Sequence, residues 1–334
     1  MTRALITGIT GQDGSYLAEF LHARDYEVFG LVRGDDAAEQ LRERLPFAEP
    51  LRGDLGDLAS LETALAESQP TEVYNLGAYS SVSRSWEQAE RAADITGVGA
   101  LRLLDAVRRS GRSDEIRIYQ ASSSEMYGEA TTSPQDEATP FAPVHPYAVA
   151  KVFAHQIVLT YRRAYGIFAV GGILFNHESP RRGPDFVTRK ISRGVARVRL
   201  GLQDHLTLGT LEVRRDWGYA PEYVEAMWLM MQQEEAEDYV IATGVTHSVR
   251  DFVEAAFLHA GIPDWEPLVE IDPGLQRPTD IAELRGNPAK ARDRLGWTAA
   301  TAFEELVGIM VDADLAREQA RTAPATTGGE RRGE

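Results

Sequence analysis

Two residues on one predicted helix carry the side chains of a proton-transfer pair. Tyr147 and Lys151 are four positions apart in the segment PYAVAK, so an α-helix there places both side chains on the same face. A nearby ammonium group stabilises a phenolate and makes tyrosine usable as a base near neutral pH. The same spacing is common on amphipathic helices, where it joins a surface tyrosine to a solvated lysine. The pair therefore needs support from the rest of the chain.

A hydroxyl and a carboxylate precede this pair in the segment QASSSEMYG. Ser123 can hydrogen-bond a reacting oxygen, and Glu125 can act as a second acid or base. The simplest alternative for Glu125 is a polar residue in a loop after a strand. Because ligands bind at the carboxyl ends of parallel strands, its position favours a catalytic role. Ser123, Glu125, Tyr147 and Lys151 together predict chemistry beyond simple hydride transfer.

The composition narrows the class of protein. A chain of 334 residues with 43% hydrophobic and 26% charged residues is typical of one large or two closely joined globular domains. The net charge of −16 argues against binding to nucleic acid or anionic membranes, so basic residues that bind an anion must be clustered. Such a cluster is formed by Arg181, Arg182, Arg189, Lys190, Arg214 and Arg215.

Cysteine usage and hydropathy indicate the compartment. The chain has no cysteine, which excludes disulfides, thiol catalysis and thiolate metal sites, and we predict no metal site. No apolar run approaches the ~18–20 residues that span a bilayer. A strand pattern already begins at Ala4, so we expect no secretory leader. These features predict a cytoplasmic protein that does not contact membranes.

The elements that must position these side chains alternate between strands and helices. Residues 2–174 contain five apolar strand patterns separated by segments with helical spacing, which predicts a parallel sheet covered on both faces. We therefore expect an α/β fold, a doubly wound Rossmann domain over residues 1–175. Residues 176–320 should form a smaller, interleaved substrate domain, with 213–244 returning to the Rossmann domain. Residues 321–334 are predicted to be a disordered tail.

A glycine-rich loop follows the first predicted strand. Gly8, Gly11 and Gly14 form G-x-x-G-x-x-G before a helical segment, with Gln12 and Asp13 inside the motif. Glycines permit a tight turn and bring backbone N–H groups close to a pyrophosphate at a helix N-terminus. An ordinary βα turn is the alternative, but a βαβ unit follows, which favours dinucleotide binding.

Strand ends indicate which dinucleotide is bound. The second strand ends in VRGDD, where Arg33 suits a 2′-phosphate and the following Asp35 and Asp36 suit a ribose hydroxyl. We favour NADP through Arg33 and keep NAD as the alternative. Further cofactor contacts are expected after the third and fourth strands, at Asp54, Leu55, Leu76 and Ala78.

The chain resembles a known family along most of its length. G-x-x-G-x-x-G with Y-x-x-x-K is typical of short-chain dehydrogenases/reductases. The segments ALITGITGQDGSYLAEFL, LFNHESPRRG, FVTRKI, RDWGYAPEYVEAMW and EDYVIATG resemble the GDP-mannose 4,6-dehydratase family from Thr2 to about Asp314. The resemblance implies a lyase that makes GDP-4-dehydro-6-deoxymannose and water from GDP-mannose, with an internal hydride shuttle on NADP.

The resemblance also implies roles for single residues. Tyr147 takes the proton of the sugar 4-hydroxyl, and Lys151 lowers the pKa of Tyr147 and holds the nicotinamide ribose. Glu125 removes the proton at C5, and Ser123 binds O4. His177 and Arg182 contact the cofactor. The nucleotide sugar is bound by Ser85, Asn176, Val187, Lys190, Arg215, Arg277 and Glu283. Arg193, Arg197 and Arg199 are interpreted as solvated surface residues.

Three departures from the family pattern leave questions open. The loop GDDAAEQ after the second strand is shorter than is usual in the family. The cofactor can therefore be NADP or NAD, and the assembly can be a homodimer or a homotetramer. Tyr79 and Ser81 replace the usual glutamine and histidine, and Gln276 replaces an aromatic residue. A reductase or epimerase acting on a related GDP- or other NDP-hexose is the alternative activity, and a noncatalytic redox sensor is a third. Broad apolar helix faces in 93–110 and 146–166 predict oligomers.

Overall fold

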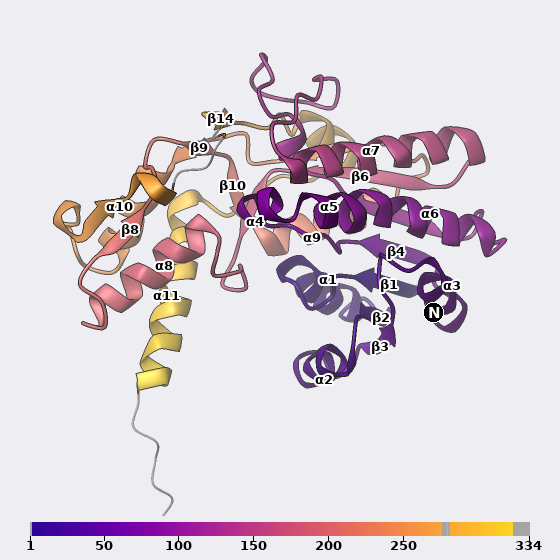
Figure 1. The fold of residues 1–334 in the computed structure, drawn as a ribbon, viewed down its shortest axis with the longest axis horizontal. Coiled ribbons are helices and arrows are strands. Elements are labelled where there is room, and N and C mark those ends of the chain that lie inside the picture. The colour runs from indigo at the N-terminus through magenta and orange to yellow at the C-terminus, as the bar shows by residue number, and fades with distance from the viewer. Residues whose placement is uncertain (1, 276–278, 280, 323–334) are drawn as a thin grey trace, which may run out of the picture.

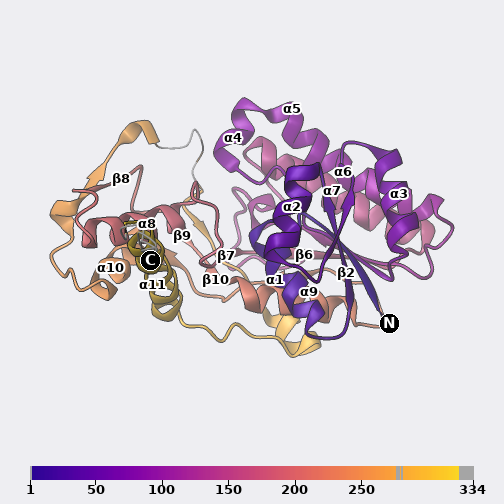
Figure 2. The same cartoon turned by 90° about the horizontal axis from the view of Figure 1, so that it is seen from below.

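The computed structural model of the chain describes residues 2–275, 279 and 281–322. A central sheet and its helices form one lobe, and a smaller lobe built around α8, α10 and α11 lies beside it (Figures 1 and 2). Residues 323–334 of the predicted tail lie outside the described residues. The two residues of that segment that are described, Arg321 and Thr322, contradict the prediction because they belong to the last helix.

The larger lobe contains a sheet of seven parallel strands in the order β11-β6-β5-β4-β1-β2-β3. Its strands are β1 (Arg3–Thr7), β2 (Glu27–Val32), β3 (Glu49–Arg52), β4 (Glu72–Asn75), β5 (Arg117–Ala121), β6 (Ala169–Leu174) and β11 (Tyr239–Ile241). The chain order reverses between β1 and β4, where doubly wound folds bind their ligands. The predicted α/β fold class with a Rossmann sheet is therefore confirmed.

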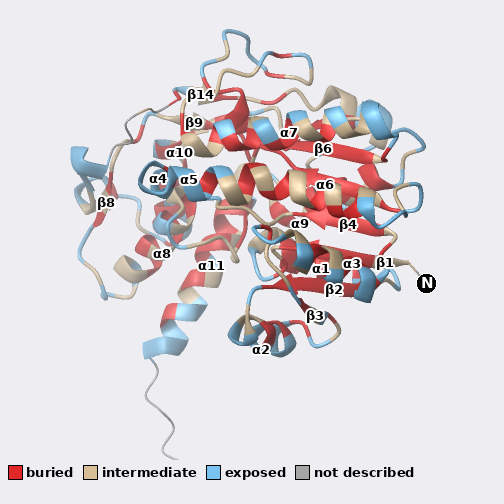
Figure 3. Ribbon diagram, turned by 45° about the vertical axis from the view of Figure 1, so that its right-hand side comes forward, coloured by how far each residue is buried: buried red, intermediate tan, exposed pale blue. Residues whose placement is uncertain are grey.

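Helices cover both faces of this sheet, and the strands are buried (Figure 3). Along β1, Ala4 and Ile6 face one core while Leu5 faces the other, because side chains alternate across a strand. The first face carries α1 (Gln12–His22), α2 (Asp35–Arg44) and α9 (Ala220–Met231). The second carries α3 (Leu58–Ser68), α6 (Gly99–Arg109) and α7 (Pro146–Tyr165).

The smaller lobe has its own apolar core. Side chains of α8 (Val187–Arg199), α10 (Val249–His259) and α11 (Phe303–Thr322) pack there with β8 (Leu206–Leu208). Short strands connect the lobes. β7 (Asn176–Glu178) pairs with β10 (Trp217–Tyr219), and β9 (Arg214–Arg215) lies between β12 (His247–Ser248) and β14 (Glu283–Leu284). Within the smaller lobe, β13 (Val269–Ile271) pairs with β8.

Several shorter helical turns complete the fold. They are α4 (Val82–Glu87), α5 (Ala89–Ala92), the π-helical η1 (Ala93–Val98) and η5 (Ala291–Leu295), and the 3₁₀ turns η2 (Ser124–Met126), η3 (Glu266–Leu268) and η4 (Pro273–Leu275). The helix expected over 93–110 is thus continuous to Arg109, with π-helical hydrogen bonding in η1 and α-helical hydrogen bonding in α6.

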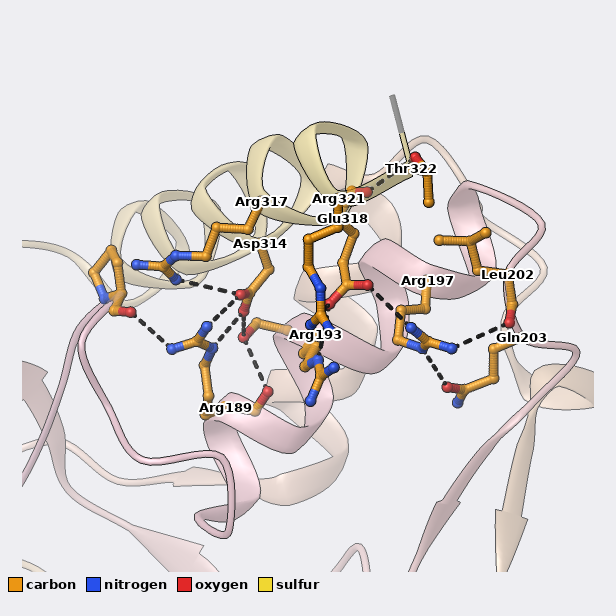
Figure 4. Close-up of polar contacts among 12 residues, drawn as sticks. Arg189, Arg193, Arg197, Leu202, Gln203, Asp314, Arg317, Glu318, Arg321 and Thr322 are labelled. Atoms are coloured by element: carbon orange, nitrogen blue, oxygen red, sulfur yellow. Dashed lines mark hydrogen bonds and ion pairs between the residues drawn. The ribbon is translucent and has the colours of Figure 1, made fainter. Parts of the chain in front are cut away.

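Arginines of α8 are ion-paired with acids of α11 (Figure 4). Arg193 Nε and Arg197 Nη1 lie 2.9 and 3.0 Å from the carboxylate of Glu318, whose side chain is 5% exposed. Their interpretation as solvated residues without a role is therefore wrong, because both are paired with an acid more than a hundred positions away, although their side chains remain 37% and 32% exposed. Arg199 is exposed, as expected.

Candidate active site

The predicted Y-x-x-x-K segment opens the long helix α7. His145 is its N-cap and Pro146 occupies the first turn, where a missing N–H costs nothing. Gly166 ends the helix in a left-handed conformation with φ 67°. Tyr147 and Lys151 therefore lie in the first two turns, next to the carboxyl end of β5.

Glu125 lies in the short 3₁₀ turn η2, which directly follows β5. Ser123 caps this turn by accepting a hydrogen bond from the Glu125 N–H at 3.3 Å. Glu125 and Ser123 are both buried. The Glu125 carboxylate contacts His145, whose Nε2 lies 3.0 Å from Oε2. His145 is not among the predicted site residues, although Pro146 in the first turn of a helix indicates that the residue before it is the helix cap.

Tyr147 is the proposed acid/base group at the sugar 4-hydroxyl. Burial is the largest influence on its phenol and raises its pKa to about 12, while a hydrogen bond from Ser123 and the charge of Arg182 act in the opposite direction. The predicted lowering of this pKa by Lys151 is therefore wrong for the protein without ligands, because burial outweighs the influences that lower it. Burial also lowers the pKa of Lys151 to about 8. The Lys151 ammonium donates to the carbonyl of Ala121 at 2.6 Å and lies 5.7 Å from the centre of the Tyr147 ring.

The glycine-rich loop joins β1 to α1. Gly8 has a φ of +71°, a conformation that L side chains rarely adopt. A Cβ atom on Gly14 would lie 2.3 Å from the Gly8 carbonyl oxygen, so only glycine permits this close packing. The N-cap of α1 is Gly11, which offers no side-chain cap. The first N–H groups of α1 are therefore available to an anion such as a pyrophosphate.

A buried ion pair fixes this loop to β7. His177 Nδ1 lies 2.7 Å from the Phe175 carbonyl, and its Nε2 lies 3.0 Å from Asp13 Oδ2. Both neighbours are acceptors, so both ring nitrogens donate and the ring is an imidazolium. Burial alone would raise the pKa of Asp13 and lower that of His177, but their mutual attraction and hydrogen bond prevail. The pKa of Asp13 falls to about 2 and that of His177 rises.

One cavity of about 710 Å³ brings most of the predicted residues together. It extends from the glycine-rich loop to η2 and the start of α7. Its lining includes the predicted residues Gly8, Gly11, Gln12, Asp13, Gly14, Arg33, Asp54, Leu55, Leu76, Ala78, Ser123, Glu125, Tyr147, Lys151, Asn176, His177 and Arg182. Val82, Arg91 and Phe186, for which no role was predicted, also line it, as does Arg181 of the predicted basic cluster. Only the tertiary structure brings them there.

Other predicted residues do not line this cavity. Ser85 is buried and donates to the Val82 carbonyl at 2.6 Å. Arg215 donates to the Ile281 carbonyl at 2.8 Å from β9, next to β14, where Glu283 accepts from Thr246 Oγ1 at 2.6 Å. Val187 is half-buried and Lys190 exposed on α8. The predicted contact Arg277 and the departure Gln276 lie outside the described residues.

The residues present fit a nicotinamide dinucleotide. The uncapped N-terminus of α1 and the glycine cradle suit its pyrophosphate, and Arg33, Asp54 and Leu55 lie where its adenosine would be expected. Asp35, which left the choice of cofactor open, forms an ion pair with Arg52 of β3. Arg33 lines the cavity, whereas Asp35 and Asp36 do not.

Comparisons with known proteins agree with this geometry. The family model described as GDP-mannose 4,6 dehydratase matches residues 5–310. The chain belongs to the GDP-mannose 4,6-dehydratase family. The human GDP-mannose 4,6 dehydratase is 50% identical, and the match covers 96% of this chain and 93% of the human protein.

Solved structures of related folds superpose along the chain. The UDP-glucose 4-epimerase of Thermus thermophilus in complex with NAD has a TM-score of 0.82 at 29% identity, covering 97% of this chain and 100% of that one. RMD from Pseudomonas aeruginosa complexed with NADPH has a TM-score of 0.80 at 24% identity, covering 95% and 100%, which shows a shared fold. The chain thus shares its fold with one protein solved in complex with NAD and with another solved in complex with NADPH.

The Asp13–His177 pair predicts a pH dependence of stability in this family member. The elevated pKa of His177 means that its contribution is complete below about pH 6.5, the unperturbed pKa, and is lost as the pH rises through the folded-state value. Asp13 contributes above its unperturbed pKa of 3.8, and this is lost as the pH falls toward about 2.

Urea unfolding between pH 6 and 9 should show this loss, because each unit of pKa elevation corresponds to about 1.4 kcal/mol. We expect His177→Gln to remove most of this slope, whereas His22→Gln, on the exposed end of α1, should retain it. Equal slopes in the wild-type protein and His177→Gln would contradict the assignment of a buried imidazolium.

Proposed function

We propose that this protein converts GDP-mannose to GDP-4-dehydro-6-deoxymannose and water, with a nicotinamide dinucleotide that is restored in each cycle. The observation that carries the proposal is the placement of Glu125 in one cavity with Tyr147 and the glycine-rich loop. A simple epimerase or 4-keto reductase needs the tyrosine and the lysine but no base at C5. A base beside them is what an elimination requires.

The proposed roles follow from this placement. The nicotinamide, when bound, would supply an acceptor and later a donor of hydride. Tyr147 takes the proton of the sugar 4-hydroxyl, and Ser123 hydrogen-bonds the same oxygen. Oxidation at C4 acidifies the C5–H, and Glu125 takes that proton. The hydroxyl at C6 then leaves as water with a proton from the protonated Glu125 carboxyl, and the product is completed by return of the hydride to C6 and of a solvent proton to C5. Lys151, buried one turn after Tyr147, holds the nicotinamide ribose.

The nucleotide sugar would extend from this centre toward the smaller lobe. Asn176 lines the cavity, and its Oδ1 is buried without a hydrogen-bond partner among the described residues, which suits a sugar hydroxyl. Arg215 and Glu283 lie on adjacent strands and suit a diphosphate and a guanine edge. Ser85, Val187, Lys190 and Arg277 remain proposed contacts by family resemblance.

Mass spectrometry of GDP-mannose, incubated with the purified protein and catalytic NADP, tests this function. Loss of one water without net formation of NADPH supports the dehydratase. Stoichiometric consumption of NADPH in a parallel reaction supplied with NADPH would instead indicate a reductase. Unchanged mass with a shifted chromatographic position would indicate an epimerase. Unchanged GDP-mannose in the presence of verified bound cofactor would contradict the proposed substrate.

NADP is the proposed form of the cofactor. Arg33 lines the cavity, whereas Asp35 is paired with Arg52, so an arginine faces the expected 2′-phosphate. We expect Arg33→Ser to weaken NADP binding by roughly tenfold or more, the usual effect of removing a charge-assisted hydrogen bond, and to leave NAD binding nearly unchanged. Isothermal titration with each cofactor measures this. Arg42→Ala, an exposed arginine of α2, is the matched control, and an equal loss in both variants would argue against a phosphate contact at Arg33.

A homodimer is the proposed assembly, with a homotetramer as the alternative. On α7, Val149 and Phe153 are four residues apart on one face and have relative exposures of 54% and 42%, so two apolar side chains of that face are open to solvent. A second copy packing on this face would bury it. Light scattering at micromolar concentration checks this, and a monomer mass would contradict it.

The protein is also proposed to act in the cytoplasm, which the lack of cysteine supports. Among the described residues, no helix is both long and apolar enough to cross a membrane.

A further inference from the structure

A buried histidine connects the start of α7 to the proposed base. His145 belongs to the loop before α7, and Glu125 belongs to η2, yet their side chains meet, with Nε2 and Oε2 separated by 3.0 Å. The His145 side chain is 2% exposed and that of Glu125 is 10% exposed. At this burial, the hydrogen bond is largely shielded from competing water.

The helix cap decides the protonation of this histidine. Nδ1 accepts the N–H of Ala148 at 3.1 Å, so it must carry a lone pair. A neutral imidazole then carries its proton on Nε2, which donates it to Glu125. Protonation at Nδ1 would place an N–H against the Ala148 N–H and break the cap. His145 is therefore a fixed donor to the carboxylate and does not serve as a second base while α7 is capped.

The same ring also borders the other proton-transfer group. His145 and Tyr147 are stacked, with centroids 6.0 Å apart and planes 8° apart. The His145 side chain thus fixes the direction of the Glu125 carboxylate, which acts at C5, relative to Tyr147, which acts at C4. A carboxylate that rotates freely loses this alignment, and an alignment error at a reacting atom is costly in rate.

We propose that His145 is a positioning residue for the elimination step, which holds the Glu125 carboxylate toward the sugar C5–H through its Nε2–H donor. This inference rests on the proposed function, because it needs Glu125 to be the base. It assigns His145 no contact with substrate or cofactor. Its effect should be confined to the steps after oxidation at C4.

Two substitutions separate the two nitrogens of His145. In His145→Asn the side-chain oxygen takes the position of Nδ1 and keeps the helix cap, while the donor to Glu125 is lost. In His145→Gln the terminal amide reaches the position of Nε2 and keeps the donor, while the cap is weakened. Comparison of the two variants therefore shows whether the rate depends on the hydrogen bond to Glu125 or on the cap of α7.

We expect His145→Asn to lower kcat by about 10- to 100-fold, as for loss of a hydrogen bond to a charged group, with KM little changed. Stopped-flow absorbance of reduced nicotinamide should then rise and persist after mixing with GDP-mannose, because oxidation at C4 proceeds and elimination is slow. His145→Gln should recover most of the rate despite a lower thermal midpoint.

The opposite order overturns the proposal. If His145→Gln is slow and His145→Asn is near wild type, the residue acts only as a helix cap. If the variants are slow without reduced nicotinamide, the defect precedes elimination and the assigned role is wrong. A wild-type protein that binds cofactor but makes no dehydrated product would instead refute the proposed function, and the inference would be rejected with it.

Discussion

We expect Glu125→Gln to lower the rate of product formation by roughly 10²- to 10⁴-fold, the usual contribution of a general base. Glutamine has nearly the same shape as glutamate and can still accept the Nε2–H of His145, but its amide takes no proton from C5. Oxidation at C4 depends on Tyr147 and should survive. Reduced nicotinamide should therefore accumulate after mixing with GDP-mannose, and deuterium from solvent should not enter C5.

Tyr147→Phe is the matched control for this experiment. It removes the acid/base group of the first step, so it should lower turnover by a comparable factor without any accumulation of reduced nicotinamide. The two variants then differ in where the cycle stops. Near wild-type turnover of Glu125→Gln would mean that another group removes the C5 proton.

The second large effect is expected on stability, at the buried ion pair between α8 and α11. The Asp314 side chain is 1% exposed and accepts from Arg189 through two bonds of 2.6 and 2.7 Å and from Ser192 Oγ at 2.7 Å (Figure 4). Asp314→Ala leaves the Arg189 guanidinium buried without its countercharge. We expect the free energy of unfolding to fall by about 3–5 kcal/mol, as when one partner of a buried pair is removed.

Urea unfolding measures this loss, and the neighbouring Arg321→Ala is the control. The Arg321 side chain is 66% exposed and lies 3.5 Å from Glu318, so its loss should change stability by less than about 0.5 kcal/mol. A replacement of both partners, Arg189→Met with Asp314→Leu, should recover much of the loss because the exposed Arg317 is then the charge that loses its partner, and no buried charge is left unpaired. Equal effects of Asp314→Ala and Arg321→Ala would contradict a dominant role for burial.

This ion pair also bears on the cavity. The Arg189 guanidinium donates to the carbonyls of Pro180 at 2.7 Å and Arg182 at 3.0 Å, and so holds the segment that carries Arg181 and Arg182 against α8. Because that segment lines the cavity, a loosened Arg189 should also weaken cofactor or substrate binding. The sequence places Arg189 in a basic cluster but gives no indication that it is already neutralised.

The sequence by itself determined the local parts of the site. Glycine spacing predicted the turn between β1 and α1, because only glycine fits where a Cβ atom would meet the Gly8 carbonyl. Helical spacing placed Tyr147 and Lys151 on one face, and the alternation of strands and helices predicted the parallel sheet. These features depend on neighbours a few residues away, so their physical causes can be read along the chain.

Only the tertiary structure decided which distant groups meet. His145 contacts Glu125 because α7 begins beside η2, and Asp13 becomes paired with His177 because β7 passes the glycine-rich loop. The sequence alone predicts that Arg193 and Arg197 are solvated, but in the folded chain α11 places Glu318 next to both of them. The protonation state and the burial of a side chain depend on contacts with residues far away in the sequence, and residue spacing does not predict these contacts. The sequence therefore determined which chemical groups are present, and the path of the chain decided their partners and protonation.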